Sequence, residues 1–121
     1  MVKGIGTDII EVSRIEKAIS SYGDRFLDKI FTVTEQEYCN KHKDSSRHFA
    51  GRFAAKEAIV KALGKGIGRE IHWCDIEILN DEKGKPFIVF TPRVKDLLDD
   101  PDVIISISHC KEYATATAIW K

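Results

Sequence analysis

The sequence has few cysteines, no long apolar run and no net charge, and each absence excludes a class of protein. Its three cysteines, Cys39, Cys74 and Cys110, are widely spaced and form no Cys-x-x-Cys pair, so they fit reduced thiols better than disulfides or zinc ligands. No run approaches the roughly 20 apolar residues of a membrane span, and residues 1–6 lack the pattern of a signal peptide. We therefore expect a cytoplasmic protein that is neither secreted nor held in a membrane.

The formal net charge is zero, yet the basic residues are unevenly distributed. Between positions 41 and 69, eight Lys or Arg residues and two acidic residues give the stretch a charge of +6. A nucleic-acid-binding domain is usually basic as a whole, so a basic patch on a neutral protein favours a specific anionic ligand. A solvated helix surface explains the same charges equally well at this point.

Hydrophobic periodicity and turn residues predict an α+β fold in a single domain, residues 1–121. We expect a mostly antiparallel sheet of about five strands, packed with a long central helix and shorter helices. The expected strands cover residues 2–12, 71–79, 87–90, 103–109 and 113–120, and the expected helices cover 13–22, 24–31, 34–42, 45–63 and 92–98. The predicted helix caps are Ser13, a capping box of Thr34 and Glu37, Ser45 or Ser46, and Gly64.

Residues 49–63, followed by the glycine-rich loop 64–68, form the most informative segment. The segment reads as one helix that places Glu57 and Lys61 four residues apart, and therefore on the same face. The rest of that face is apolar and small, and charged groups are expensive to bury there without a partner. The face therefore either holds an ion pair or meets a charged ligand.

Asp8 is a second carboxylate in an unusual setting, because it lies within an apolar strand. Gly4 and Gly6 share its face of that strand and leave room for another group to approach closely. Asp8 and Glu57 suit Mg²⁺, which takes one or two carboxylates and completes its shell with water and substrate phosphates. In the alternative interpretation Asp8 ends a strand and Glu57 forms an ordinary surface pair. The sequence leaves both open.

Three familiar motifs are incomplete. The Gly4-Ile-Gly6 segment lacks the third glycine of a dinucleotide fingerprint, and loop 64–68 follows a helix, whereas a P-loop leads from a strand into a helix. Ser106-Ile-Ser-His109 has no nucleophile elbow, which argues against a serine hydrolase. The loop and His109 can each bind a phosphate, although a helix C-cap and an exposed polar residue are the simpler interpretations.

Together these segments resemble the holo-[acyl-carrier-protein] synthases, the short bacterial class of 4′-phosphopantetheinyl transferases. The resemblance runs nearly end to end, and the Lys-Glu-Ala-x-x-x-Lys core of the long helix is most specific when paired with the Asp8 strand. It rests on the segments Gly4–Glu11, Phe49–Ala62, Asp75–Ile78, Gly84–Pro86, Ser106–His109 and Glu112–Ala114.

The resemblance implies a Mg²⁺-dependent enzyme of fatty acid biosynthesis that transfers phosphopantetheine from coenzyme A to a serine of apo-acyl carrier protein, releasing adenosine 3′,5′-bisphosphate. Asp8 and Glu57 match the metal carboxylates, and Lys61 matches the lysine near the pyrophosphate, so these three are the expected catalytic residues. Family members form homotrimers with active sites between neighbouring subunits. The expected coenzyme A contacts are Arg52, Lys61, Gly64, Lys65 and His109, and the expected carrier contacts are Arg14 and Arg25.

Two other classes of function stay open at the level of sequence. A non-catalytic coenzyme A or nucleotide-binding module would bind its ligand without forming a Mg²⁺-dependent product. A structural trimer would use Glu57 and Lys61 as a core ion pair and would bind no ligand. Neither a nucleic acid nor a membrane is expected as a partner.

Overall fold

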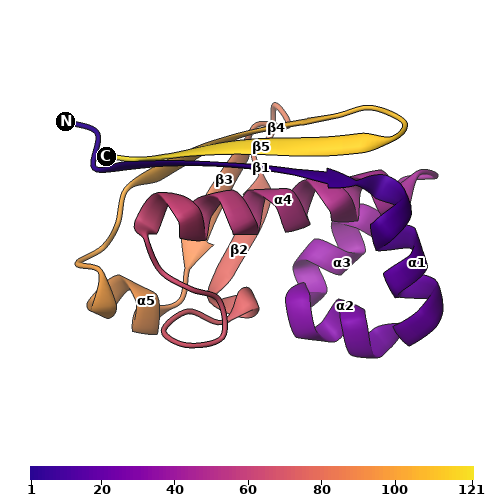
Figure 1. Cartoon of the computed structure of the whole chain (residues 1–121), viewed down its shortest axis with the longest axis horizontal. Helices are drawn as coiled ribbons and strands as arrows, with labels where there is room; N and C mark the ends of the chain where they lie inside the picture. Colours follow the sequence, from indigo (N-terminus) through magenta and orange to yellow (C-terminus); the bar gives the residue numbers. More distant parts are fainter.

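The structure, a computed structural model, describes residues 1–121. In Figure 1, helix α4 lies along one face of a long sheet, helices α1, α2 and α3 group at one end, and α5 lies at the other. None of the helices combines the length and apolarity needed to cross a membrane. In chain order the elements are β1 (Gly4–Glu11), α1 (Val12–Tyr22), α2 (Asp24–Ile30), α3 (Val33–Asn40), α4 (Ser45–Leu63), the 3-10 turn η1 (Trp73–Asp75), β2 (Ile76–Asn80), β3 (Pro86–Phe90), α5 (Pro92–Leu97), β4 (Val103–His109) and β5 (Tyr113–Trp120).

The α+β prediction is confirmed, but the strands form two sheets instead of one. Strands β1, β5 and β4 pair in that order, all antiparallel, and β2 pairs with β3 as a separate antiparallel hairpin. Strand β2 starts at Ile76, five residues later than expected from Ile71, because the 3-10 turn η1 interrupts the extended chain. That turn is closed by Asp75, whose carboxylate accepts the backbone N–H of His72 at 2.8 Å.

Strand β1 and helix α4 pack almost backbone to backbone, and glycine makes this possible. A Cβ atom on Gly4 would lie 2.0 Å from the carbonyl oxygen of Ala62, and one on Gly6 would lie 2.0 Å from that of Ala58. The sequence prediction that these glycines admit a close neighbour is confirmed, and the neighbour is α4. The close approach sets Asp8 of β1 directly beside the charged face of α4.

Three of the predicted helix caps differ from those in the structure. The capping box is formed by Thr32 and Glu35, two residues before the predicted pair: the N–H of Glu35 donates to the Thr32 hydroxyl at 3.2 Å, and the N–H of Thr32 donates to the Glu35 carboxylate at 2.9 Å. Ser13 lies inside α1, which begins at Val12. Helix α4 begins at Ser45 without a side-chain cap, whereas Gly64, with φ of 70°, ends it as predicted.

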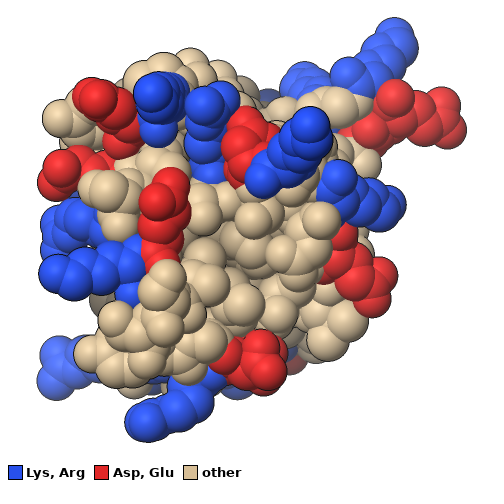
Figure 2. Space-filling model, turned by 90° about the vertical axis from the view of Figure 1, so that its right-hand side faces the viewer, with Lys and Arg blue, Asp and Glu red and all other residues tan.

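The +6 stretch does not form one basic patch, so that surface expectation was wrong. Arg52 and Lys56 are buried. Arg47, Lys61 and Lys65 each lie within ion-pair distance of a carboxylate, at 3.1 Å, 3.2 Å and 3.3 Å. Figure 2, which views the end of the molecule that carries α1 to α3, shows basic and acidic side chains interspersed around an uncharged area.

Candidate active site

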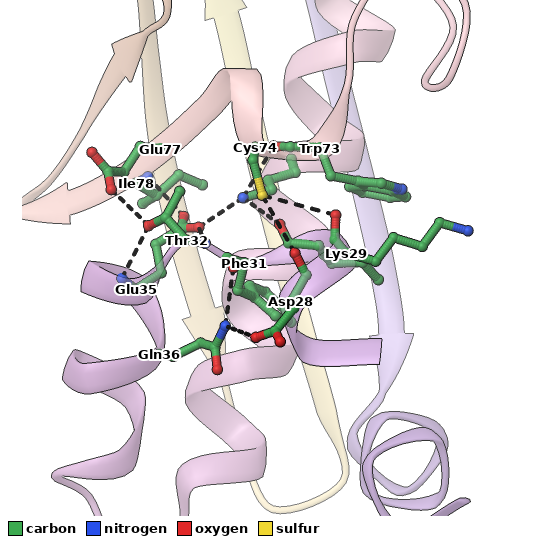
Figure 3. A network of polar contacts seen from close by, with 12 residues as sticks. Asp28, Lys29, Phe31, Thr32, Glu35, Gln36, Trp73, Cys74, Glu77 and Ile78 are labelled. Atoms are coloured by element: carbon green, nitrogen blue, oxygen red, sulfur yellow. Dashed lines mark hydrogen bonds and ion pairs between the residues drawn. The ribbon is translucent and has the colours of Figure 1, made fainter. Parts of the chain in front are cut away.

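A buried ion pair anchors α4, the helix that carries most of the candidate site. The Lys56 ammonium donates to the Glu35 carboxylate at 2.7 Å and to the carbonyl oxygens of Ile30 and Trp73 at 2.7 Å and 3.2 Å. The second oxygen of Glu35 accepts the N–H of Ile78 at 2.8 Å. Figure 3 shows this network joining α4 to α2, α3, η1 and β2. Both charged side chains are fully buried, so neither can turn to water.

The Lys56 network also determines where the next residue points. Burial lowers the pKa of Lys56, and the nearby Glu35 carboxylate opposes that change. Removing one partner of a buried pair is costly, so the pair holds α4 firmly in one rotation about its axis. A step of one residue turns an α-helix by about 100°. Glu57 therefore leaves the buried network and faces a cavity that it shares with residues of β1.

Asp8 and Lys61 form the polar contact between β1 and α4. The Lys61 ammonium lies 3.2 Å from the Asp8 carboxylate and donates to the carbonyl oxygen of Thr7 at 3.1 Å. Lys61 is half exposed and Asp8 is mostly shielded, with side-chain exposures of 53% and 17%. The structure contains no Glu57–Lys61 ion pair, so the interpretation of those two residues as an ordinary surface pair was wrong.

Glu57 has a perturbed carboxyl group. Its pKa is raised, chiefly because burial disfavours the charged form and then because of the negative charge of Asp8, while Lys61 acts in the opposite direction. Both carboxylates line one open cavity of about 420 Å³. Arg14 and Phe53 line it too, so a cation and an apolar wall border the acidic pair.

The acidic pair fits Mg²⁺ in number and type of ligand. No group of three or more His, Cys, Asp or Glu side chains is arranged to hold a metal ion. Mg²⁺ does not need such a cage, because it keeps several waters and uses one or two carboxylates together with substrate phosphates. Burial is the main cause of the raised pKa of Glu57, and the repulsion by Asp8, the second cause, is of the kind that a divalent cation relieves.

A second cavity of about 160 Å³ contains Arg52 and His109, which the sequence named together. Arg52 is 4% exposed. Its guanidinium donates to the Asn80 side-chain oxygen at 2.5 Å and lies 4.1 Å from the centre of the Tyr38 ring, and its Nε has no partner. No carboxylate pairs with this guanidinium, so the cavity holds a buried cation without its counter-charge.

The remaining predicted residues, Arg25, Gly64 and Lys65, lie outside these two cavities. Arg25 lines a neighbouring hollow with Phe26, and Phe26 also borders the cavity of Asp8 and Arg14, so the two hollows adjoin. Gly64 and Lys65 line neither of the two cavities described above. Lys65 instead lies 3.3 Å from the carboxylate of Glu70.

Sequence reasoning missed several residues of the second cavity. Asn80, Gly84 and Pro86 were not among the predicted binding residues, although Gly84–Pro86 is one of the segments that carry the resemblance, and all three line the cavity next to Arg52. His48 and Tyr38 line it too. Their spacing in the sequence carried no signal, because α3, α4 and the β2–β3 turn meet only in the fold.

Comparison with known proteins identifies the family. The sequence model of the 4′-phosphopantetheinyl transferase superfamily matches residues 4–118. The chain belongs to this superfamily. Within the superfamily, the chain is 54% identical to the holo-[acyl-carrier-protein] synthase of Protochlamydia amoebophila over 120 residues, 99% of this chain and 98% of that protein. It is also 54% identical over 115 residues to that of Chlamydia pneumoniae, covering 95% of this chain and 93% of the relative.

Solved structures of the superfamily agree with the fold. The holo-[acyl-carrier-protein] synthase of Helicobacter pylori in complex with coenzyme A has a TM-score of 0.88 and 36% identity, over 97% of this chain and 99% of that one. The enzyme from Neisseria meningitidis has a TM-score of 0.92 and 31% identity, over 100% and 99% of the chains. The predicted resemblance and the assignment to a family of phosphopantetheinyl transferases are therefore confirmed.

Proposed function

We propose that the chain transfers the 4′-phosphopantetheine group of coenzyme A to a serine of apo-acyl carrier protein, in the cytoplasm and as a step that serves fatty acid biosynthesis. Its relatives are named for this synthase activity, and two solved relatives are complexes with coenzyme A or its adenosine 3′,5′-bisphosphate part. The observation that carries the proposal is that Asp8 and Glu57 line one cavity together with Arg14, while the Lys61 ammonium lies 3.2 Å from the Asp8 carboxylate.

In the proposed reaction the serine oxygen forms a bond to the β-phosphorus of coenzyme A. The bond from that phosphorus to the oxygen bridging toward the α-phosphate breaks, and adenosine 3′,5′-bisphosphate leaves with the electron pair. Lys61, half exposed at the cavity edge, is placed to stabilise the negative charge that builds on the leaving group. Glu57 is our candidate for accepting the serine proton, because its raised pKa makes it a stronger base than an ordinary carboxylate.

Asp8 and Glu57 would hold the Mg²⁺ ion that the family resemblance implies. The ion, when bound, supplies positive charge that offsets the pyrophosphate and the developing negative charge on the bridging oxygen. Asp8 also positions Lys61, because the contact between the two side chains keeps the Lys61 ammonium beside the Asp8 carboxylate. Loss of either carboxylate should therefore weaken metal binding, and loss of Asp8 should also release the Lys61 ammonium from its place.

Arg52 and His109 are the proposed contacts for phosphate groups of coenzyme A, and the uncompensated guanidinium of Arg52 supports this role. Gly64 and Lys65, at the start of the loop after α4, are further proposed contacts for coenzyme A. Arg14 and Arg25 are the proposed docking residues for the acidic carrier protein. Exposed charges of this kind accelerate and orient the encounter more than they tighten it.

We also propose that residues 1–121 act as one domain that assembles into a homotrimer with active sites between subunits. The face of the β1–β5–β4 sheet turned away from α4 supports this proposal. Ile5 and Ile9 on β1 are 68% and 66% exposed, and Ile104 on β4 lies in the same cross-strand row as Ile5. An uncovered row of large apolar side chains marks an interaction surface.

The proposed function is tested by incubating the protein with apo-acyl carrier protein, coenzyme A and Mg²⁺ and measuring the carrier by intact-protein mass spectrometry. We expect a mass gain of one phosphopantetheine on the carrier, lost in Asp8→Asn and Glu57→Gln and retained in Asp96→Asn, an exposed carboxylate on α5. Activity near the wild-type rate in the first two variants refutes their roles. Coenzyme A binding without any mass gain identifies a non-catalytic binding module instead.

A further inference from the structure

Three of the four histidines of this chain gather at the second cavity, although they come from three separate segments. The rings of His42 and His48 are stacked with their centres 3.7 Å apart and an interplanar angle of 24°. The ring of His109 meets that of His48 edge-on at 5.1 Å. His48 and His109 line the cavity that contains Arg52. His42 does not line the cavity, but its ring stacks against that of His48.

The surroundings of the cluster are mostly cationic or aromatic. From α3, the ring of Tyr38 lies 5.0 Å from His42, and the Tyr38 carbonyl oxygen accepts the His42 Nδ1–H at 3.0 Å. From α4, Arg52 contributes the one permanent cation. The one carboxylate nearby is Asp44, which lies 3.7 Å from His48 Nε2.

Asp44 is already engaged by another group, because its second oxygen lies 3.1 Å from the guanidinium of Arg47. Asp44 therefore offers the imidazoles only part of a counter-charge. The hydrogen bond from His42 Nδ1 leaves Nε2 of that ring as its open acceptor. A proton added at that atom, or on His48, has no dedicated protein partner.

In the free protein the surroundings of His48 favour its neutral form. Burial lowers the pKa of His48, the positive charges of His42, His109 and Arg52 lower it further, and Asp44 alone raises it. Two rings at a stacking distance of 3.7 Å cannot both carry a charge without strong repulsion. A phosphate changes this balance, because it brings a charge of about −1.5 to −2 and several strong acceptor oxygens.

We propose that His48, which lines the cavity with Arg52 and His109, takes up a proton when a phosphate group of coenzyme A binds there, and that His42, stacked on His48, opposes this protonation in the free protein. The proposal rests on the function proposed above, and it adds two residues, His42 and His48, and a proton to the binding step. The bound phosphate supplies the counter-charge that Asp44 cannot give.

The direction of the pH dependence follows from this coupling. The bound ligand raises the pKa of His48 above its value in the free protein. Binding is therefore strengthened as the pH falls through the bound-state pKa, and the gain is complete below the free-state pKa. Each unit of difference between the two values strengthens binding about tenfold at low pH.

The test is calorimetric titration of coenzyme A into the full chain at pH 6.5 and pH 8.5. Each titration is done in two buffers with different heats of ionisation, because the difference in binding heat gives the number of protons taken up. The phosphomonoester of the ligand itself titrates near pH 6, so the comparison is between variants. We expect His48→Gln to take up fewer protons than wild type when coenzyme A binds. The affinity of this variant for coenzyme A should also lose most of its dependence on pH. His42→Gln should shift that dependence to higher pH, since one repelling neighbour is gone. His72→Gln, the fourth histidine and exposed, should behave as wild type.

A direct readout keeps the proposal testable if a variant folds poorly. The imidazole C2–H resonances of the wild-type protein, followed by NMR against pH, should titrate at higher pH with coenzyme A bound than without it. Equal midpoints, or equal proton uptake in wild type and His48→Gln, overturn the proposal and leave the transfer reaction intact. A wild type that binds no coenzyme A overturns this proposal together with the proposed function. Repeating the titration with dephospho-coenzyme A tells whether the 3′-phosphate or the pyrophosphate is the anion.

Discussion

Replacing Lys56 by methionine is the sharpest test of how α4 is held in place. Methionine fills a similar volume but removes the ammonium, so the Glu35 carboxylate stays buried without its cation. Breaking a buried pair in this way costs about 3–5 kcal/mol. The lower end is expected here, because Glu35 keeps the N–H groups of Thr32 and Ile78 as donors at 2.9 Å and 2.8 Å.

Urea unfolding monitored by circular dichroism measures this loss directly. In thermal unfolding, at about 4 °C per kcal/mol for a chain whose length lies between the usual size classes, a loss of about 3 kcal/mol should lower the melting temperature by roughly 12 °C. An unpaired buried carboxyl group is relieved by taking up a proton, so Lys56→Met should lose less stability at pH 5 than at pH 7.5.

The matched control is Lys95→Met, an exposed lysine on α5, which should change stability by less than about 0.5 kcal/mol. A loss in Lys56→Met no larger than in this control would show that the buried network does not hold α4. The same result would remove our reason for the direction in which Glu57 points.

Three further predictions concern packing, pH and docking. Gly6→Ala should destabilise the protein by several kcal/mol or abolish soluble expression, since its Cβ would lie 2.0 Å from a carbonyl oxygen of α4, while Gly66→Ala, with open space around it, should have a melting temperature near wild type. Transfer activity should decline as pH falls through the raised pKa of Glu57, because the protonated acid cannot accept the serine proton, and a wild-type pH–rate profile flat to pH 4 would refute that role. Arg14→Glu should raise the KM for carrier protein far more than that for coenzyme A at low salt, and equal effects on both would argue against docking.

Strands β4 and β5 were predictable because their signals are local, whereas β2 was predicted to start five residues too early. Alternating apolar residues gave β4 and β5 their boundaries, Val103–His109 and Tyr113–Trp120, as expected. The capping box was harder, since Thr32 and Thr34 both precede an acidic residue by three positions. The structure uses Glu35 because that carboxylate also reaches Lys56 on α4, a partner 21 positions away that no local pattern reveals.

The candidate site was only half visible in the sequence. Gly4 and Gly6 signalled a close neighbour for β1, and that neighbour proved to be the helix that carries Glu57. Charge counting along 41–69 failed, because folding buries Arg52 and Lys56 and places Lys61 beside Asp8, a carboxylate 53 positions away. The sequence carried no signal for His48, because the rings that contact it come from other segments.

The most direct test of the central claim follows both products of a single reaction. Wild-type protein, apo-acyl carrier protein, coenzyme A and Mg²⁺ are mixed, and the phosphopantetheinylated carrier and the released adenosine 3′,5′-bisphosphate are quantified together by mass spectrometry. We predict equal amounts of the two products, and none of either when Glu57 is changed to Gln or when the serine of the carrier is changed to Ala. Unmodified carrier after prolonged incubation with wild-type protein would contradict the proposed function.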